Sequence, residues 1–499
     1  MKATQSREHW GSKLGFILAA AGSAVGLGNI AFFPKTAAEN GGGLFVLLYI
    51  LAILIVGVPI MLAELAIGRA SQSNPVGAFR KLAPRSAWFL VGGMGVLAGF
   101  LILSFYGVIG GWITGYLWES ISGVVTSFDT VAGLQAHYTS VTTSPTWAVG
   151  FYFVFMALTI YIVYGGVGAG IERWSKLLMP VLLILMVLVI VRGLFIPGSG
   201  EGLRFLFLPK LDDMNATTLA AALSQAFFSL SLGMGAMITY GSYLKDDQNL
   251  PVSAVEVSAL DTLIAILAGM AIFPALFALN PAVGPDNVPG GFGMLFYTFP
   301  QIFLEMFGGN IPLARIFAAL FFLLVLIAAL TSSISLLEVV TAYFVDQRGW
   351  PRKRAAVGLG LAIFLFGIPS AISGDFQNVI SEITYGYMLP VGGFLISVFC
   401  AWIWGRQGSL ASATVGSPGF RLGRLWHLIL KWLAPFIIFQ IILGKVLDDL
   451  ARYGIATTPA GFVSAMQKVF FYIDAVLMIA AVVGAFYFWL SRSRDGAAT

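Results

Sequence analysis

The residues with the clearest capacity for chemistry are carboxylates that lie inside apolar stretches. Asp261 is surrounded by apolar residues in the run VSALDTLIAILAG, and Glu64 and Glu338 lie in two other apolar runs. An ionisable group inside a membrane is costly, so each is a candidate functional residue. For Asp261, a hydrogen bond to a neighbouring helix is the structural alternative. Glu64 and Glu338 are expected to have structural or gating roles rather than to bind an ion.

A second set of oxygen atoms comes from Thr331-Ser332-Ser333, which follow Ala328-Ala329-Leu330. A single hydroxyl inside a helix usually bonds back to its own backbone. Three in succession, facing a helix with free carbonyl groups, would suit a hard cation such as sodium, which prefers oxygen ligands. The histidines His9, His137 and His427 and the lone Cys400 show no metal-ligand spacing and allow no internal disulfide.

Free carbonyl groups are predicted where an apolar helix is interrupted. The run from Leu14 to Pro34 contains Gly22-Ser23-Ala24-Val25-Gly26-Leu27-Gly28-Asn29, in which glycines weaken the helix at mid-membrane depth. A similar pattern returns as Ser229-Leu230-Ser231-Leu232-Gly233-Met234-Gly235. Broken backbone is tolerated in a membrane only where it is buried or lines a cavity. Two such breaks in corresponding halves of a chain indicate a transporter's binding site.

The composition requires a membrane protein. Of 499 residues, 58% are hydrophobic and 10% are charged, and the mean hydropathy is +0.89. Soluble domains carry about a quarter charged residues. The net charge of +5 comes from basic residues in short loops, so nucleic-acid binding is not expected. Phosphate-binding loops and the common catalytic motifs are missing from the sequence, so no enzyme is predicted.

Apolar runs of about 20 residues predict about twelve spans in a single transmembrane domain covering 1–499. They are expected near 14–34, 44–69, 88–118, 147–165, 176–196, 221–244, 253–279, 313–345, 355–372, 378–404, 425–446 and 469–490. A cleaved signal peptide is the alternative for the first run, but that run continues to Phe33 without a polar break. Lysine and arginine in alternate loops predict that both termini lie in the cytoplasm. We expect a multi-pass protein of a prokaryotic plasma membrane. The loops at 120–145, 197–220 and 280–312 are then the largest outer segments.

Several motifs, in the right order from about residue 7 to 490, resemble the neurotransmitter:sodium symporter family, and most closely its bacterial amino-acid members of the LeuT type. The motifs are Arg7-Glu8-His9-Trp10, Gly22 to Asn29, Glu39-Asn40-Gly41-Gly42-Gly43, Gly170-Ile171-Glu172-Arg173, Ser229 to Gly235, Tyr240-Gly241-Ser242-Tyr243 and Leu330 to Ser333.

This resemblance implies an all-α fold with an inverted repeat, 14–196 and 221–404, followed by two further spans in 425–490. It also implies two sodium sites. The first would be formed by Ala24, Asn29, Ser229 and Asp261, together with the substrate carboxylate. The second would be formed by Gly22, Val25, Ala328, Thr331 and Ser332. Sodium in the first site would touch the substrate, which is a physical reason for coupled transport.

The resemblance also implies a substrate pocket. Its residues would be Ala24, Leu27, Gly28, Ile102, Tyr106, Phe228, Ser229, Ser231, Met234, Ser332 and Leu336. Gly26 stands where monoamine carriers of the family have an aspartate, and it leaves room for a substrate with its own carboxylate. The remaining wall is apolar, so we expect a neutral, hydrophobic amino acid. Asp261 stands where many relatives have an asparagine, near Tyr49 and Gln225, and its charge predicts transport without chloride.

The gates match the family only in part. At the inner end, Arg7, Trp10, Tyr243 and Asp346 match. At the outer end Phe32 replaces the usual arginine and Ser381 stands at the position of its aspartate partner, so both halves of an ion pair are missing together. We therefore expect an outer lid closed by apolar contact of Phe32 over Tyr106 and Phe228.

Some alternatives stay open on the sequence. The substrate could be another zwitterion or an osmolyte. A ligand sensor that transports nothing is a second alternative, and the missing outer ion pair is its only support. A channel is disfavoured because no filter or ring of like charges is present. The oligomeric state is open, with a homodimer as one arrangement.

Overall fold

The computed structural model describes residues 8–210, 216–279, 293–414, 423–452 and 473. In these ranges all regular secondary structure is helical. Nine helices are long and apolar enough to cross a membrane, and a bent pair of shorter helices adds a tenth span within the same ranges. The fold is therefore that of an all-α polytopic membrane protein, as predicted.

Eight of the nine long helices follow the predicted spans to within four residues at each end, whereas Val167–Leu194 begins nine residues before the predicted span 176–196. Their bounds are Gly43–Ser71 (α3, η2 and α4), Phe89–Ser122 (α6), Pro145–Tyr164 (α8), Val167–Leu194 (η4 and α9), Leu250–Leu279 (α13), Ile311–Arg348 (α15), Arg352–Ile372 (α16), Gly374–Ile403 (α17 to η8) and Gly423–Leu450 (α20, η9 and most of α21). The predicted span at 469–490 lies outside the described residues, apart from residue 473.

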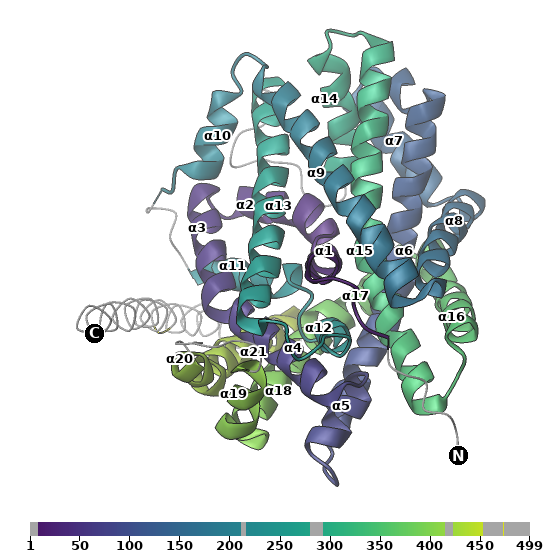
Figure 1. The fold of residues 1–499 in the computed structure, drawn as a ribbon. Helices are drawn as coiled ribbons and strands as arrows, with labels where there is room; N and C mark the ends of the chain where they lie inside the picture. Colours follow the sequence, from purple (N-terminus) through teal and green to yellow (C-terminus); the bar gives the residue numbers. More distant parts are fainter. Residues whose placement is uncertain (1–7, 211–215, 280–292, 415–422, 453–472, 474–499) are drawn as a thin grey trace.

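The first predicted break is present. Helix α1 (Lys13–Ala24) ends before Val25, and the chain resumes as η1 (Gly28–Phe32) and α2 (Phe33–Glu39) after a bend of 51°. α1 packs against α9, α13 and α15, so it lies near the centre of the bundle in Figure 1. The broken backbone is thus enclosed by protein, as a membrane interior requires.

The second predicted break separates α11 (Ala216–Ser229) from α12 (Ala236–Gly241). Gly233 and Gly235 have φ values of +83° and +76°, in the left-handed region that favours glycine. A Cβ on Gly233 would lie 2.2 Å from the carbonyl oxygen of Leu389. Ser231 also has a positive φ, +54°, which marks a strained non-glycine position of the kind that gathers at functional sites.

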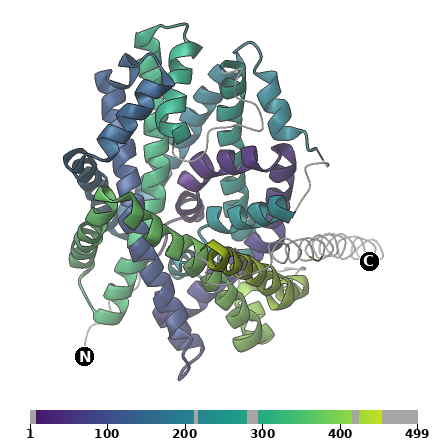
Figure 2. The ribbon, with the colours of Figure 1, turned by 180° about the vertical axis from the view of Figure 1, so that it is seen from behind.

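Short helices in the three longest loops lie at one end of the bundle. They are α7 (Val131–Thr142), α10 (Gly200–Phe207) and α14 (Phe299–Met306). Figures 1 and 2 show these helices at the end opposite α5 (Pro75–Leu82). This end corresponds to the predicted outer side, where the loops at 120–145 and 280–312 lack lysine and arginine. α10, in the third of these loops, contains Arg204 and is an exception to the pattern.

Candidate functional site

The two breaks meet around a small cavity of about 40 Å³. With the exception of Ser229, every predicted pocket residue lines it. The lining residues that match the prediction are Ala24, Leu27, Gly28, Ile102, Tyr106, Phe228, Ser231, Met234, Ser332 and Leu336. The fold thus brings together side chains that are up to 312 positions apart in the sequence, from Ala24 to Leu336, although their role in binding stays a prediction.

One wall of the cavity carries polar donors close to Gly26. The backbone N–H of Leu27 lies 3.5 Å from the hydroxyl of Tyr106. A Cβ at Gly26 would lie 2.4 Å from Ser332 Oγ and 3.1 Å from Tyr106 Oη. A side chain at position 26 would therefore fill the space between these donors. With glycine there, the space is available to a polar group of a bound molecule.

Another part of the lining is aromatic and includes Tyr385, a residue that the sequence does not predict to lie there. The rings of Phe228 and Tyr385 lie edge to face with centroids 4.6 Å apart, and Phe105 meets Tyr385 at 5.3 Å. Phe32 meets Phe228 edge to face at 5.7 Å. Phe228 and Tyr385 line the cavity, and Phe32 packs against Phe228. We name Phe32, Phe228 and Tyr385 the aromatic lid, after the role that the sequence predicts for Phe32.

Ser381 does not reach the aromatic lid through its hydroxyl. It is half-buried and donates to the carbonyl of Asn378 in its own helix, at 2.9 Å. Tyr385 follows it by four residues, one helical turn later, and is the residue of this segment that lines the cavity. The signal in the sequence is therefore an aromatic residue one turn beyond the predicted gate position.

Asp261 lies behind the cavity and is fully buried. Its carboxylate accepts hydrogen bonds from Asn29 Nδ2 at 2.8 Å, from Ser229 Oγ, and from Tyr49 Oη at 3.4 Å. Tyr49 Oη and Ser229 Oγ lie 2.8 Å apart. These partners, all from the described chain, are uncharged. Because burying a carboxylate among neutral groups is costly, the cluster fits a cation held by oxygen atoms.

Oxygen atoms also gather where Thr331 and Ser332 face the first break. Ser332 Oγ donates to the carbonyl groups of Val25 and Ser23, at 3.1 and 3.2 Å. Thr331 Oγ1 lies 3.3 Å from the Val25 carbonyl oxygen and 3.0 Å from that of Ala328. Thr331 thus bonds both to its own helix and across to the break. Uncharged oxygen ligands of this kind suit sodium.

Gly22 and Ser333 lie differently relative to this oxygen cluster. A Cβ on Gly22 would lie 3.2 Å from Thr331 Cβ, so glycine lets α1 approach α15 closely here. Ser333 points to another neighbour, since its hydroxyl lies 2.8 Å from Thr159 Oγ1 on α8 and donates to the Leu330 carbonyl. The hydroxyl of Ser333 therefore links two helices instead of facing the first break. The spacing of the three hydroxyl residues in the sequence does not distinguish this role from binding an ion.

Glu64 supports the second break. It is fully buried, and its Oε1 accepts a hydrogen bond from the backbone N–H of Gly233 at 2.7 Å. A buried N–H of broken backbone is costly unless it is paired, and the carboxylate provides that pairing. This contact agrees with the structural role expected for Glu64.

Toward the end of the bundle opposite α7, α10 and α14, Glu338 is fully buried between Tyr243 and Arg352. Its carboxylate accepts from Tyr243 Oη at 2.6 Å and from Arg352 Nη2 at 2.5 Å. Trp10 joins them, since its backbone N–H donates to the Tyr243 carbonyl at 3.2 Å and its indole to the Tyr240 carbonyl at 3.0 Å. This inner network pins the N-terminal segment to the second broken helix.

Two further residues are predicted for the inner gate, Arg7 and Asp346. Arg7 is outside the described residues. Asp346 is exposed and accepts hydrogen bonds from the backbone and side-chain nitrogens of Asn74, at 2.8 and 3.1 Å. The sequence marks Arg352 only as a basic loop residue, because its pairing with Glu338 depends on how the loop turns back onto α15.

The Arg352→Gln variant is expected to lose about 3–5 kcal/mol of stability, since Glu338 would remain buried without its cation. Equilibrium unfolding in mixed detergent micelles measures the loss, with the exposed Arg348→Gln as a matched control. The double variant Arg352→Gln, Glu338→Gln removes both charges and should regain most of the stability. A double variant as unstable as the single one would contradict this account of the pair.

Comparison with known proteins identifies similar chains. Residues 7–130 and 131–491 match the sodium:neurotransmitter symporter family. An uncharacterised sodium-dependent transporter of Bacillus subtilis, YhdH, is 38% identical over 456 residues, covering 89% of this chain and 98% of the relative. An uncharacterised sodium-dependent transporter of Haemophilus influenzae is 35% identical over 465 residues, covering 89% and 99%.

Among solved structures, MhsT in complex with L-phenylalanine is 45% identical in sequence. It superposes with a TM-score of 0.78, covering 88% of this chain and 99% of that one.

Proposed function

We propose that this chain, which belongs to the sodium:neurotransmitter symporter family, imports a neutral, hydrophobic amino acid together with sodium. The observation that carries the proposal is the cavity at Gly26. Its donors, Tyr106 and the backbone around Leu27, suit a carboxylate brought by the substrate. Its other walls, including Ile102 and Leu336, suit an apolar side chain.

The similar protein MhsT, which has been solved with L-phenylalanine, supports an amino-acid substrate. Met234, buried at the cavity, is flexible and would adjust to apolar side chains of different size. Sodium dependence itself is a property of the family. The two ion sites at Asp261 and at Thr331 are our assignment. It is supported by the buried carboxylate of Asp261 and by the hydroxyl and carbonyl oxygen atoms that gather around Thr331.

Coupling follows from the position of Asp261. Sodium held by Asn29, Ser229 and Asp261, with the Ala24 carbonyl, would lie next to the substrate carboxylate. Each charge moved inward gains about 2.3 kcal/mol per 100 mV of membrane potential. In the transport cycle, the aromatic lid would close over the filled cavity and the inner network would then open.

We also propose that transport is independent of chloride. The carboxylate of Asp261 already receives the hydroxyl groups of Tyr49 and Ser229, which are the groups that would otherwise bind an anion. Gln225 is engaged with the Gly28 carbonyl at 3.0 Å. Uptake should therefore stay unchanged when chloride is replaced by gluconate, and its disappearance would refute this part of the proposal.

The topology belongs to the same proposal. Residues 14–196 and 221–404 would form the inverted repeat, with both termini on the cytoplasmic side of a prokaryotic inner membrane. Reporter fusions at the two termini and in the loop at 120–145 test the orientation. Only the loop fusion should be accessible from outside.

The decisive experiment is uptake into proteoliposomes under an inward sodium gradient, using labelled amino acids and other zwitterions such as osmolytes. Accumulation of a hydrophobic amino acid that stops when sodium is replaced by potassium supports the proposal. Accumulation of an osmolyte alone would favour the other zwitterion class. Sodium-dependent binding without accumulation would instead favour a ligand sensor.

If the aromatic lid retains the substrate in the cavity, substitutions of Phe32 should weaken the apparent affinity for the substrate. Phe32→Ala removes the edge contact with Phe228 and is expected to raise the KM for uptake about three- to tenfold, the usual worth of an aromatic pair. Phe32→Leu keeps most of the apolar area and should have a smaller effect. Equal KM values for both variants and the parent would show that Phe32 does not close the cavity.

A further inference from the structure

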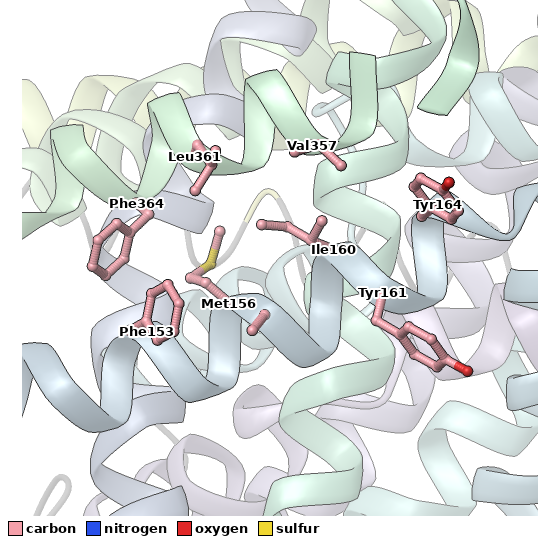
Figure 3. A pocket seen from close by; sticks show the side chains of 9 residues that line it. Phe153, Met156, Ile160, Tyr161, Tyr164, Val357, Leu361 and Phe364 are labelled. Carbon is pink, nitrogen blue, oxygen red and sulfur yellow. The ribbon is translucent and has the colours of Figure 1, made fainter. Parts of the chain in front are cut away.

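An apolar groove lies on the outer surface of the bundle between α8 and α16, away from the transport site. Its volume is about 360 Å³. Figure 3 shows side chains of both helices along it, with Phe153 and Phe364 facing each other at one end and Tyr164 near Val357 at the other. The helices themselves are apolar spans, so the groove opens to hydrocarbon rather than to water.

The groove has a floor and rims of different accessibility. Met156 is 1% exposed and lies deep, whereas Tyr161 and Leu361 on the rims are 66% and 43% exposed. Gly360 lets the helices approach closely below the groove, since a Cβ there would lie 2.3 Å from Ile160 Cγ1. The groove is therefore a slot of fixed depth that runs along the two helices.

Both ends of the slot are defined. Phe153 and Phe364 close one end with ring centroids 5.6 Å apart. At the other end, the ammonium of exposed Lys353 lies 4.9 Å from the centre of the Tyr164 ring. From Lys353 to Phe364 the helix rises about 16 Å, which is about half of the 30 Å hydrocarbon core. The slot thus has the length of one lipid leaflet.

The end of the slot at Lys353 is positively charged and would lie at the membrane surface, where it suits an anionic lipid headgroup. Tyr164 and Tyr161 carry hydroxyls on apolar rings, as residues at a membrane interface do, and Tyr161 packs against Trp174 at 6.3 Å. The nearby carboxylates Glu338 and Glu172 are paired with Arg352 and Lys176, whereas Lys353 lies over an aromatic ring.

From this arrangement we propose that the groove binds one acyl chain of an anionic phospholipid from the leaflet at the Lys353 end. The chain would lie over Met156 and Ile160, with its terminal methyl group toward Phe153 and Phe364. The lipid phosphate would lie against the ammonium of Lys353 and the hydroxyl of Tyr164. This lipid site is separate from the amino-acid and sodium sites, and its test does not depend on transport.

The test uses the full-length protein in phosphatidylcholine vesicles that contain phosphatidylglycerol with a diazirine in its acyl chain. After illumination, mass spectrometry locates the labelled residues. We expect labels on Met156, Ile160 and Leu361 well above those around Leu177, which is 55% exposed on α9 (Arg173–Leu194) and lies outside the groove. Lys353→Gln should lower groove labelling about fivefold, the effect of one basic residue near an anionic lipid.

The controls separate this site from general lipid contact. Lys431 also lies over an aromatic ring, that of Trp402 at 4.6 Å, so Lys431→Gln should leave groove labelling unchanged. Ile160→Trp should fill the slot and abolish labelling, with Leu177→Trp as its control, and Lys353→Gln tests the site without altering the packing. Equal labelling of the groove and the Leu177 region, equal effects of the two lysine variants, or cross-links between two copies of the chain across the groove would each overturn the proposal.

Discussion

Sodium-driven uptake by the Asp261→Asn variant is expected to fall about 100-fold or more in chloride-free medium, because removing one member of a buried charge pair costs several kcal/mol. The carboxylate is fully buried and accepts from Asn29, Ser229 and Tyr49. With an amide in its place, the proposed first ion site would keep its oxygen ligands but would have no protein charge to offset the cation. Proteoliposome uptake at several sodium concentrations measures the loss as a raised sodium requirement.

The addition of chloride gives a second test of the role of Asp261. An anion bound beside Tyr49 and Ser229 would supply the missing charge, so adding chloride should restore part of the uptake by Asp261→Asn while leaving the parent unchanged. Asp129→Asn, at an exposed carboxylate of the loop at 120–145, controls for the loss of one charge. An Asp261→Asn protein with the parent's sodium requirement in both media would remove Asp261 from the ion site.

The second large effect is expected from Gly26→Asp. A Cβ at this position would lie 2.4 Å from Ser332 Oγ and 3.1 Å from Tyr106 Oη, and the added carboxylate would repel that of an amino acid. We expect uptake of hydrophobic amino acids to fall about 100-fold, since like charges brought together in a buried site cost several kcal/mol. Competition by phenylethylamine, which lacks a carboxylate, should strengthen relative to the parent.

Two controls separate charge from space at this position. Gly26→Ala adds the Cβ without the charge and should impair uptake without favouring phenylethylamine. Gly374→Asp places the same residue at the start of α17 (Gly374–Ser381), where a Cβ meets no atom within 4 Å, and should leave uptake unchanged. If the Gly26→Ala and Gly26→Asp variants show the same preference for phenylethylamine over the amino acid, the pocket does not bind a carboxylate at Gly26.

The breaks in the two short helices could be predicted from the sequence because several glycines close together in an apolar run weaken a continuous helix. The cavity residues could be predicted because their motifs resemble a family whose fold brings them together. No local motif marks Ile102 or Leu336 as a cavity residue. They lie on different helices, α6 and α15, so spacing within one helix could not predict that they line the same cavity.

Other contacts depend on geometry that short motifs do not encode. Tyr385 was not predicted: its signal in the sequence is an aromatic residue one turn beyond Ser381, but its ring reaches the cavity from a π-helical turn, η7 (Glu382–Met388), whose register differs from that of an α-helix. The role of Arg352 could not be predicted because this residue follows a helix end and folds back onto Glu338. Ser333 is grouped with its neighbours in the sequence, although one residue along a helix turns a side chain by about 100°.

The aromatic lid has a consequence for the conditions under which this carrier would work. An ion pair at the outer gate would be screened by dissolved salt, whereas edge contacts between Phe32, Phe228 and Tyr385 contain no charge to screen. Closure of the lid would therefore be insensitive to ionic strength in the surrounding medium. Apolar association weakens on cooling, so temperature rather than salinity would set how long a captured substrate stays enclosed.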